Sequence, residues 1–272
     1  MFKPILSIFF IGLIFNISAC QKKELENEKS SLDIILERKI LRVGTTGDYM
    51  PFSYKEDGTV DQFSGIDIEL AKNLAKSLNV ELVFVLTSWP TLMDDLLADK
   101  FDIGMSGISI TLDRQKLAMF SEPMHFGGKA AISRDADADK YTNLAKINNP
   151  DVRVIFNPGG TNEMFARDHF PLAKLILNND NITIFEKIVS GEADVMVTDA
   201  IETIIQQEIH QELEAVNPKK PFNYSEKGYL IKRDNNFKAY IDQWVNMRLK
   251  DGTYQNIYDN EIGNSVRSVK EN

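Results

Sequence analysis

The chain has 272 residues, of which 43% are hydrophobic and 26% are charged. These values are ordinary for a globular protein with one large core or two modest ones. Its formal net charge is −9, and binding to nucleic acid needs clustered Lys and Arg, so we expect no nucleic-acid partner. The sequence contains no P-loop, G-x-G-x-x-G or G-x-S-x-G motif and no cysteine pair, and its three histidines are widely separated. We therefore expect neither a metal nor a cofactor.

The N-terminus has the features of an export signal with a lipid-attachment site. Lys3 supplies a positive charge, and residues 5–17 form an almost wholly apolar stretch that is too short for a comfortable membrane span. Small residues then precede Cys20, which resembles the bacterial lipobox, in which the cysteine becomes lipid-modified. We predict a signal peptide over residues 1–20, lipidation of Cys20 and a periplasmic protein anchored to a membrane. The alternative is an ordinary signal peptide with a chance cysteine.

The segment after Cys20 is charged and nearly free of apolar groups over residues 21–31, so we expect a solvated tether. Because Cys20 is the only cysteine in the sequence, no disulfide can form within one chain.

Strand and helix patterns alternate along the body of the chain. We predict helices over residues 32–39, 66–78 and 92–98, and strands over residues 40–44, 81–86 and 101–105. This alternation is typical of an α/β protein with a mostly parallel sheet.

A similar unit recurs in the second half of the chain. Residues 191–199 form a turn and a buried strand that ends in small polar groups, as residues 98–107 do in the first half. We interpret this as two lobes whose strand ends face one cleft, with residues 32–130 plus 223–265 in the first lobe and residues 131–222 in the second. A helical stripe in the last segment is expected to pack in the core: Tyr240, Ile241, Trp244, Val245 and Leu249.

The strand in the second lobe ends at Thr198 and Asp199, and Glu202 follows within one turn. Ligands of open α/β sheets bind outside the carboxyl ends of strands, so both carboxylates are candidate site residues. Asp199 and Glu202 also fit the D-x-x-E pattern of a helix cap, which is the favoured interpretation from these residues alone. A catalytic acid would need burial that raises its pKa.

Two further positions are candidates for binding an anion. Arg114 follows a predicted strand end and offers a planar fork that matches a carboxylate, although pairing with Asp113 or Glu122 fits equally well. The segment NPGGT at residues 157–161 would bring backbone close to a ligand at the start of a helix capped by Thr161. A turn and a cap without a ligand are the alternative.

Three other residues are open to two interpretations. Lys129 lies near the predicted crossover between the lobes, where a solvated lysine is the usual case. Tyr49 and Trp89 lie in loops after strands. Their rings either clasp a flat ligand or pack on the core.

Several segments resemble the polar amino-acid family of periplasmic solute-binding proteins. GTTGDYMPF at residues 44–52, GIDIE at residues 65–69 and Arg114 support this general resemblance. It implies an α/β fold of the two-lobed, type II (Venus-flytrap) class with mostly parallel sheets. Five further segments are similar to the cyclohexadienyl dehydratase branch of that superfamily: TSWPTLM (87–93), MSGIS (105–109), NPGGTNE (157–163), TDAIE (198–202) and SEKGYL (225–230).

The resemblance implies a dehydratase that acts on a small carboxylate substrate, prephenate or arogenate. Loss of carbon dioxide and water would give phenylpyruvate or phenylalanine, with no cofactor because aromatisation drives the step. It implies Glu202 as the general acid and Arg114 as the group that holds a substrate carboxylate. The other residues that it places in the substrate site are Tyr49, Trp89, Ser106, Lys129, Asn157, Gly160, Thr161 and Asp199.

A second hypothesis is a lipid-anchored amino-acid-binding protein of an ABC importer. The lipobox, Arg114 and Asp199 suit this role as well. The sequence leaves open the choice between prephenate and arogenate, the membrane that holds the anchor, and whether the chain forms a homo-oligomer.

Overall fold

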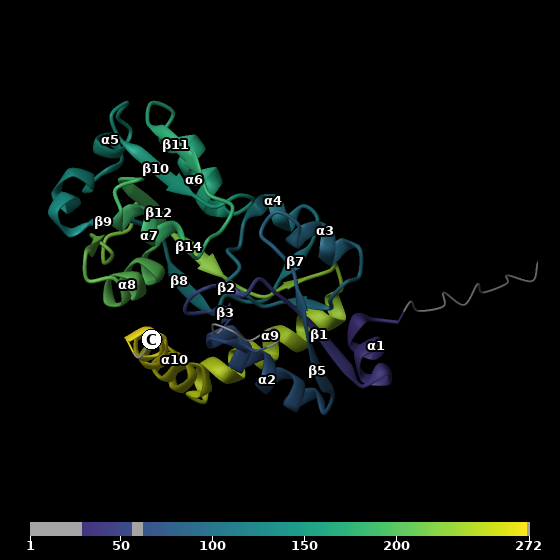
Figure 1. Ribbon diagram of the computed structural model, residues 1–272. Coiled ribbons are helices and arrows are strands. Elements are labelled where there is room, and N and C mark those ends of the chain that lie inside the picture. Colours follow the sequence, from purple (N-terminus) through teal and green to yellow (C-terminus); the bar gives the residue numbers. More distant parts are fainter. Residues whose placement is uncertain (1–28, 56–61, 271–272) are drawn as a thin grey trace, which may run out of the picture.

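The computed structural model describes residues 29–55 and 62–270 (Figure 1). The predicted signal peptide, Cys20 and most of the tether lie outside the described residues. The described chain forms two lobes, each built around a five-stranded sheet. The predicted two-lobed α/β fold is confirmed.

The sheet of the first lobe combines strands from both ends of the described chain. Its order is β5 (Glu81–Leu86), β1 (Ile40–Thr45), β6 (Ile103–Gly104), β15 (Leu230–Ile231) and β7 (Met119–Phe120). β1 pairs in parallel with β5 and β6, whereas β15 pairs antiparallel with β6 and β7. Four strands therefore share one direction, and the late strand β15 runs against them.

The sheet of the second lobe repeats this plan. Its order is β11 (Lys174–Leu177), β10 (Arg153–Phe156), β12 (Val195–Asp199), β9 (Lys129–Arg134) and β13 (Leu213–Val216). β10 is parallel to β11 and β12, and β9 is antiparallel to β12 and β13. Most strands in each sheet are thus parallel, with one inserted antiparallel strand. Lys129 and Ala130, placed in the first lobe by the sequence analysis, pair here with β12.

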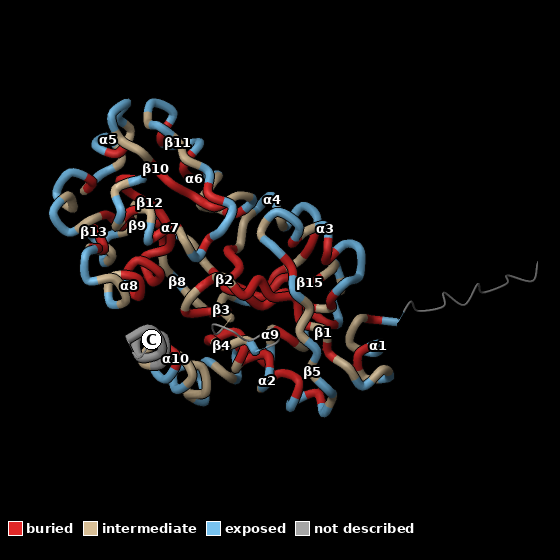
Figure 2. Tube along the Cα trace, viewed as in Figure 1, coloured by how far each residue is buried: buried red, intermediate tan, exposed pale blue. Residues whose placement is uncertain are grey.

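The strands of the second sheet are covered on both faces. Val195 and Val197 of β12 pack in one hydrophobic cluster, while Met196 between them packs in another. Successive side chains of a strand point to opposite faces. A strand buried on both faces reads as a continuous apolar run rather than an alternation, which explains the apolar stretch before Thr198. Figure 2 shows the sheets buried inside a partly exposed outer layer.

Helices surround both sheets. Those of the first lobe are α1 (Ser31–Arg38), α2 (Ile66–Leu78), α3 (Leu92–Leu97) and α4 (Leu112–Gln115). Those of the second are the 3-10 helix η1 (Asp135–Tyr141), α5 (Leu144–Ile147), α6 (Thr161–His169), α7 (Ile184–Val189) and α8 (Ala200–Ile209). The chain ends in α9 (Asn235–Lys250) and α10 (Thr253–Lys270), and α10 contacts both α2 and α8.

The predicted stripe of α9 does pack in the core of the first lobe. Ile241, Trp244 and Val245 are buried there, and Tyr240 packs against them. Leu249 is 39% exposed and lies outside that core, so the stripe ends one turn earlier than predicted.

Two small sheets lie close to the boundary of the lobes. β8 (His125–Gly127) and β14 (Ser225–Lys227) pair antiparallel, so the two chain segments that cross between the lobes run side by side. A hairpin sheet of β2 (Asp48–Tyr49), β3 (Ser53–Lys55) and β4 (Phe63–Ser64) projects from the first lobe. These two sheets position Lys227 and Tyr49 between the main sheets.

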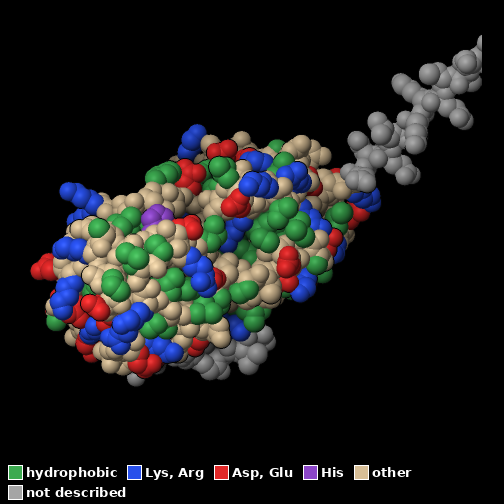
Figure 3. All heavy atoms as spheres, turned by 90° about the horizontal axis from the view of Figure 1, so that it is seen from above, with side chains coloured by type: hydrophobic (Ala, Val, Ile, Leu, Met, Phe, Trp, Pro, Cys, Tyr) green, Lys and Arg blue, Asp and Glu red, His purple; other side chains and the backbone are tan. Residues whose placement is uncertain are grey.

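The face seen from above in Figure 3 carries Lys and Arg side chains interspersed with Asp and Glu. None of the helices in the described part of the chain combines the length and the apolar character that a membrane span requires.

Candidate functional site

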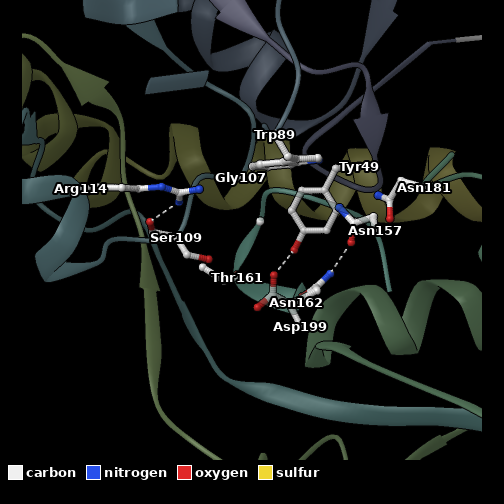
Figure 4. A pocket seen from close by; sticks show the side chains of 11 residues that line it. Tyr49, Trp89, Gly107, Ser109, Arg114, Asn157, Thr161, Asn162, Asn181 and Asp199 are labelled. Carbon is white, nitrogen blue, oxygen red and sulfur yellow. Dashed lines mark hydrogen bonds between the residues drawn. The ribbon is translucent and has the colours of Figure 1, made fainter. Parts of the chain in front are cut away.

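A cavity lies between the two lobes and encloses about 320 Å³ of empty space, part of it open to solvent. Its lining combines aromatic rings with a few polar groups, as small-molecule sites do. The first lobe contributes Tyr49, Trp89, Gly107, Ser109 and Arg114, and the second contributes Asn157, Gly160, Thr161, Asn162, Asn181 and Asp199 (Figure 4). Seven of the predicted site residues therefore line one cavity: Tyr49, Trp89, Arg114, Asn157, Gly160, Thr161 and Asp199.

Arg114 lies at one end of the cavity. Its Nη1 donates a hydrogen bond to the Ser109 carbonyl at 2.8 Å (Figure 4), and burial lowers its pKa to about 10. Asp113, the suggested partner, pairs instead with Lys116 at 2.7 Å. No carboxylate among the described residues forms an ion pair with Arg114. The guanidinium is therefore available to a ligand carboxylate.

Two aromatic rings form the opposite wall. Tyr49 and Trp89 meet edge to face, with their ring centroids 5.8 Å apart. The indole Nε1 donates to Oδ1 of Asp48 at 3.0 Å, and this bond fixes the Trp89 ring. The two rings line the cavity, and they also pack in or against the hydrophobic core of the first lobe. Both interpretations of these residues therefore remain open.

The glycine-containing turn after β10 lies against Trp89 and Pro90 of the first lobe. Gly159 has φ +78°, and a Cβ there would meet the Pro90 backbone of the other lobe at 2.5 Å. Gly160 occupies the cap position of α6 without a side-chain cap bond, and Thr161 is the first helical residue. The prediction that Thr161 caps this helix is wrong. Its hydroxyl accepts a hydrogen bond from Lys129 Nζ at 3.0 Å instead.

Asp199 lies at the centre of a buried charged cluster. Its Oδ2 accepts hydrogen bonds from the Tyr49 hydroxyl at 2.6 Å and from Lys227 Nζ at 2.7 Å. Its Oδ1 lies 3.0 Å from Lys129 Nζ as an ion pair, although this contact lacks hydrogen-bond geometry. Burial favours the neutral acid, but Lys129 and Lys227 hold the pKa of Asp199 well below its usual range.

Lys129 is only 2% exposed. It is therefore not the solvated lysine that is usual at such a position. Burial lowers the pKa of Lys129, and the charge of Asp199 opposes this shift.

Asp199 makes no side-chain cap bond to α8. It occupies the N-cap position of α8, as D-x-x-E predicts, but its side chain binds two lysines distant in sequence and not the helix.

Glu202 lies one turn into α8 and is 2% exposed. Burial raises its pKa to about 8; the Thr198 hydrogen bond opposes the shift and the charge of Asp199 adds to it. Glu202 does not itself line the cavity. The Thr198 hydroxyl donates to Glu202 Oε2 and accepts from Asn162 Nδ2, which does line it. A carboxyl group that stays protonated near neutral pH thus lies behind the cavity wall.

Three predicted site residues lie outside the cavity lining: Glu202, Lys129 and Ser106. The buried hydroxyl of Ser106 lies 2.8 Å from that of Thr46 and accepts from the Thr46 backbone N–H at 3.1 Å. Sequence reasoning missed Ser109, Asn162, Asn181 and Lys227. Lys227 lies in the SEKGYL segment, but a lysine between polar neighbours gives no sign of burial.

Within residues 29–55 and 62–270, no three or more His, Cys, Asp or Glu side chains are grouped so as to hold a metal ion. The polar groups of the cavity therefore consist of amides, hydroxyls, Arg114 and the Asp199 cluster.

A model of the bacterial extracellular solute-binding proteins, family 3, matches residues 41–264. The chain belongs to this family. It is 49% identical over 229 residues to cyclohexadienyl dehydratase of Pseudomonas aeruginosa, covering 84% of each protein. It is also 26% identical over 227 residues to the histidine-binding periplasmic protein of Salmonella typhimurium, covering 80% of this chain and 85% of that protein.

Two solved structures show the same relationship. An ancestral amino acid-binding protein, a precursor of cyclohexadienyl dehydratase, superposes with a TM-score of 0.80 at 37% identity, covering 86% of this chain and all of that one. An ancestral cyclohexadienyl dehydratase is 50% identical with a TM-score of 0.55, covering 86% of this chain and 97% of that one. Family 3 solute-binding proteins thus include binders and enzymes, and the chemistry of the site must separate the two.

Proposed function

We infer that the protein is a cyclohexadienyl dehydratase, a carbon–oxygen lyase that converts prephenate to phenylpyruvate, arogenate to phenylalanine, or both. The 49% identity to the Pseudomonas aeruginosa enzyme supports this activity. The single observation that carries the inference is Glu202, a carboxyl group buried beside the cavity with its pKa raised to about 8. A receptor that only binds amino acids has no need of a buried acid, whereas dehydration needs one.

The reaction removes two groups from a cyclohexadiene ring. The ring carboxylate leaves as carbon dioxide, and its bonding electrons enter the ring as the opposite carbon releases its hydroxyl. Glu202 supplies the proton that turns the departing hydroxide into water, by rotation of its side chain from Thr198 towards the cavity. Solvent then reprotonates Glu202. The ring becomes aromatic, so the step requires no redox change.

The other side chains bind and orient the substrate in this proposal. Arg114 holds the side-chain carboxylate with the guanidinium N–H groups that do not bind the Ser109 carbonyl. Tyr49 and Trp89 cover the ring. Lys129 and its hydroxyl and amide partners, Thr161 and Asn162, provide positive charge and donors on the side of the second lobe. Closure of the lobes excludes water from the site, which strengthens the electrostatic interactions between these groups and the substrate.

The assay for this function uses the purified mature chain and prephenate. We expect phenylpyruvate, detected by its absorbance in alkali, at a rate proportional to the protein added. No product at micromolar protein, together with tight calorimetric binding of a standard amino acid, would replace the dehydratase by an importer receptor.

We also propose that the chain is exported and anchored through a lipid on Cys20. The match to an extracellular solute-binding family supports export, and the small residues before Cys20 support lipidation. In this location the enzyme contributes to phenylalanine synthesis outside the cytoplasm.

A further inference from the structure

Lys227 is a buried cation that the proposed mechanism does not use. It is 5% exposed and extends from β14, one of the two strands that cross between the lobes. Its Nζ donates to the Gly107 carbonyl at 3.0 Å and to Asp199 Oδ2 at 2.7 Å. It also lies over the rings of Tyr49 and Phe52, at 4.9 Å and 5.3 Å from their centroids. These contacts fix the ammonium group on one oxygen of Asp199.

The remaining acceptor positions of Asp199 are also occupied. The Tyr49 hydroxyl shares Oδ2 with Lys227, and Lys129 Nζ lies 3.0 Å from the buried Oδ1. A free aspartate at a cavity wall would be the natural partner of a substrate ammonium group. Here the ammonium would be a third cation on one carboxylate whose two oxygens already face cations.

The net charge of the site also disfavours a substrate ammonium group. The three cations Lys129, Lys227 and Arg114 exceed the two carboxylates Asp199 and Asp67 by one positive charge. Cavity walls of low dielectric concentrate such a field. Prephenate and arogenate both have two carboxylates, and they differ at the side chain, which carries a keto oxygen in prephenate and an ammonium group in arogenate.

We propose that Lys227 and Lys129 together make the site selective for the keto acid, prephenate, over its amino counterpart, arogenate. The proposal rests on the dehydratase function inferred above. Lys227 acts as a specificity-determining residue by occupying Asp199, the one carboxylate among the described residues that line the cavity. The keto oxygen and the two carboxylates of prephenate meet donors and cations and present no positive charge to them.

The first test compares kcat/KM of the unmodified mature enzyme for the two substrates at one pH. We expect prephenate to be preferred by at least about tenfold, which corresponds to about 1.4 kcal/mol. Equal values, or a preference for arogenate, would overturn this proposal and leave the dehydratase function standing. Absence of product from both substrates would refute the dehydratase function and the selectivity with it.

The second test changes the residues of the cluster. Lys227→Gln exposes Asp199 Oδ2 and should move the ratio of kcat/KM towards arogenate by about fivefold or more, whereas Lys227→Arg should keep the original ratio. Lys219→Gln, at an exposed position, is the matched control. An unchanged ratio in folded Lys227→Gln would contradict the proposal.

Discussion

The hydroxyl of Thr198 donates a hydrogen bond to Oε2 of Glu202, one helical turn further along the chain, and both side chains are buried. Asn162 donates to the same hydroxyl at 3.0 Å and lines the cavity. Glu202 is therefore connected to the cavity by two side chains while it remains shielded from water. This arrangement makes the acid the first target for substitution.

Glu202→Gln should lower kcat for prephenate by about 10²-fold to 10⁴-fold, the usual contribution of a general acid. The amide keeps the shape of the side chain but has no proton to give. Steady-state kinetics measures the loss, and Glu81→Gln on an exposed strand position is the control. Full activity in Glu202→Gln would remove Glu202 from the mechanism.

The same variant separates catalysis from stability. The pKa of Glu202 is about 8 in the folded protein against an ordinary 4.5, so between these values the folded state binds a proton that the unfolded state has released. Stability due to Glu202 is present in full below pH 4.5 and is lost as pH rises to about 8. Melting temperatures should therefore rise in Glu202→Gln relative to the unmodified protein across this range. A Glu202 whose pKa were not raised in the folded state would show no such dependence on pH.

The rate of the unmodified enzyme should also depend on pH. Only protonated Glu202 can act as an acid, so kcat/KM for prephenate should fall as pH rises through about 8. Lys129, whose pKa is lowered by burial, adds to the fall when it loses its charge. A profile from pH 6 to 10 measures this, and constant kcat/KM over that range would contradict the assignment.

Arg114→Lys should raise KM for prephenate by about tenfold to a hundredfold, because one charged hydrogen-bonding fork is replaced by a point charge. The effect on kcat should be smaller, since Arg114 holds a carboxylate that does not react. Arg167→Lys makes the same change at an exposed residue paired with Glu163. If both variants had the same KM, Arg114 would not contact the substrate.

Gly159→Ala should reduce activity by hindering closure of the lobes. The added Cβ would meet the Pro90 backbone at 2.5 Å, and the residue would be strained at φ +78°. Gly252→Ala is the matched control, because Gly252 has φ +81° but nothing within 4 Å of a Cβ. Both variants should lose about 1 kcal/mol of stability, whereas only Gly159→Ala should lower kcat/KM. Equal activities would exclude this contact from closure.

Cys20→Ser should release the protein from membranes. Lipid chains on Cys20 supply the anchor in our proposal, and serine cannot accept them. Fractionation of cells that express either form measures the change, and mass spectrometry of the N-terminal peptide tests the modification directly. A chain that stays in the membrane fraction after Cys20→Ser must be held by something else.

Much of the fold and part of the site follow from the sequence because they depend on local pattern. An apolar run that ends in polar groups located the end of β12 at Asp199, and the NPGGT segment located the start of α6; the cavity lies beside both. The partners of Asp199 could not be found in this way. Its local pattern fits a helix cap, but Lys129 and Lys227 come from other strands and bind its side chain.

The contacts between the lobes could not be predicted from the sequence either. Asn181 Nδ2 donates to the Asp48 carbonyl at 2.9 Å, and Gly159 lies on Pro90. Each residue looks like an ordinary loop residue within its own lobe, and its role appears only when the lobes are brought together.

The position of β15 has a consequence for how the chain folds. The strands of the second sheet all lie between Lys129 and Val216, whereas the first sheet needs β15 to fill the space between β6 and β7. A chain emerging N-terminus first can thus complete its second lobe before its first, and the long-range pairing of β15 closes the first lobe late. Truncation before Leu230 would leave β6 and β7 without their shared partner strand, and their unpaired backbone groups would then be exposed to strand pairing with another molecule.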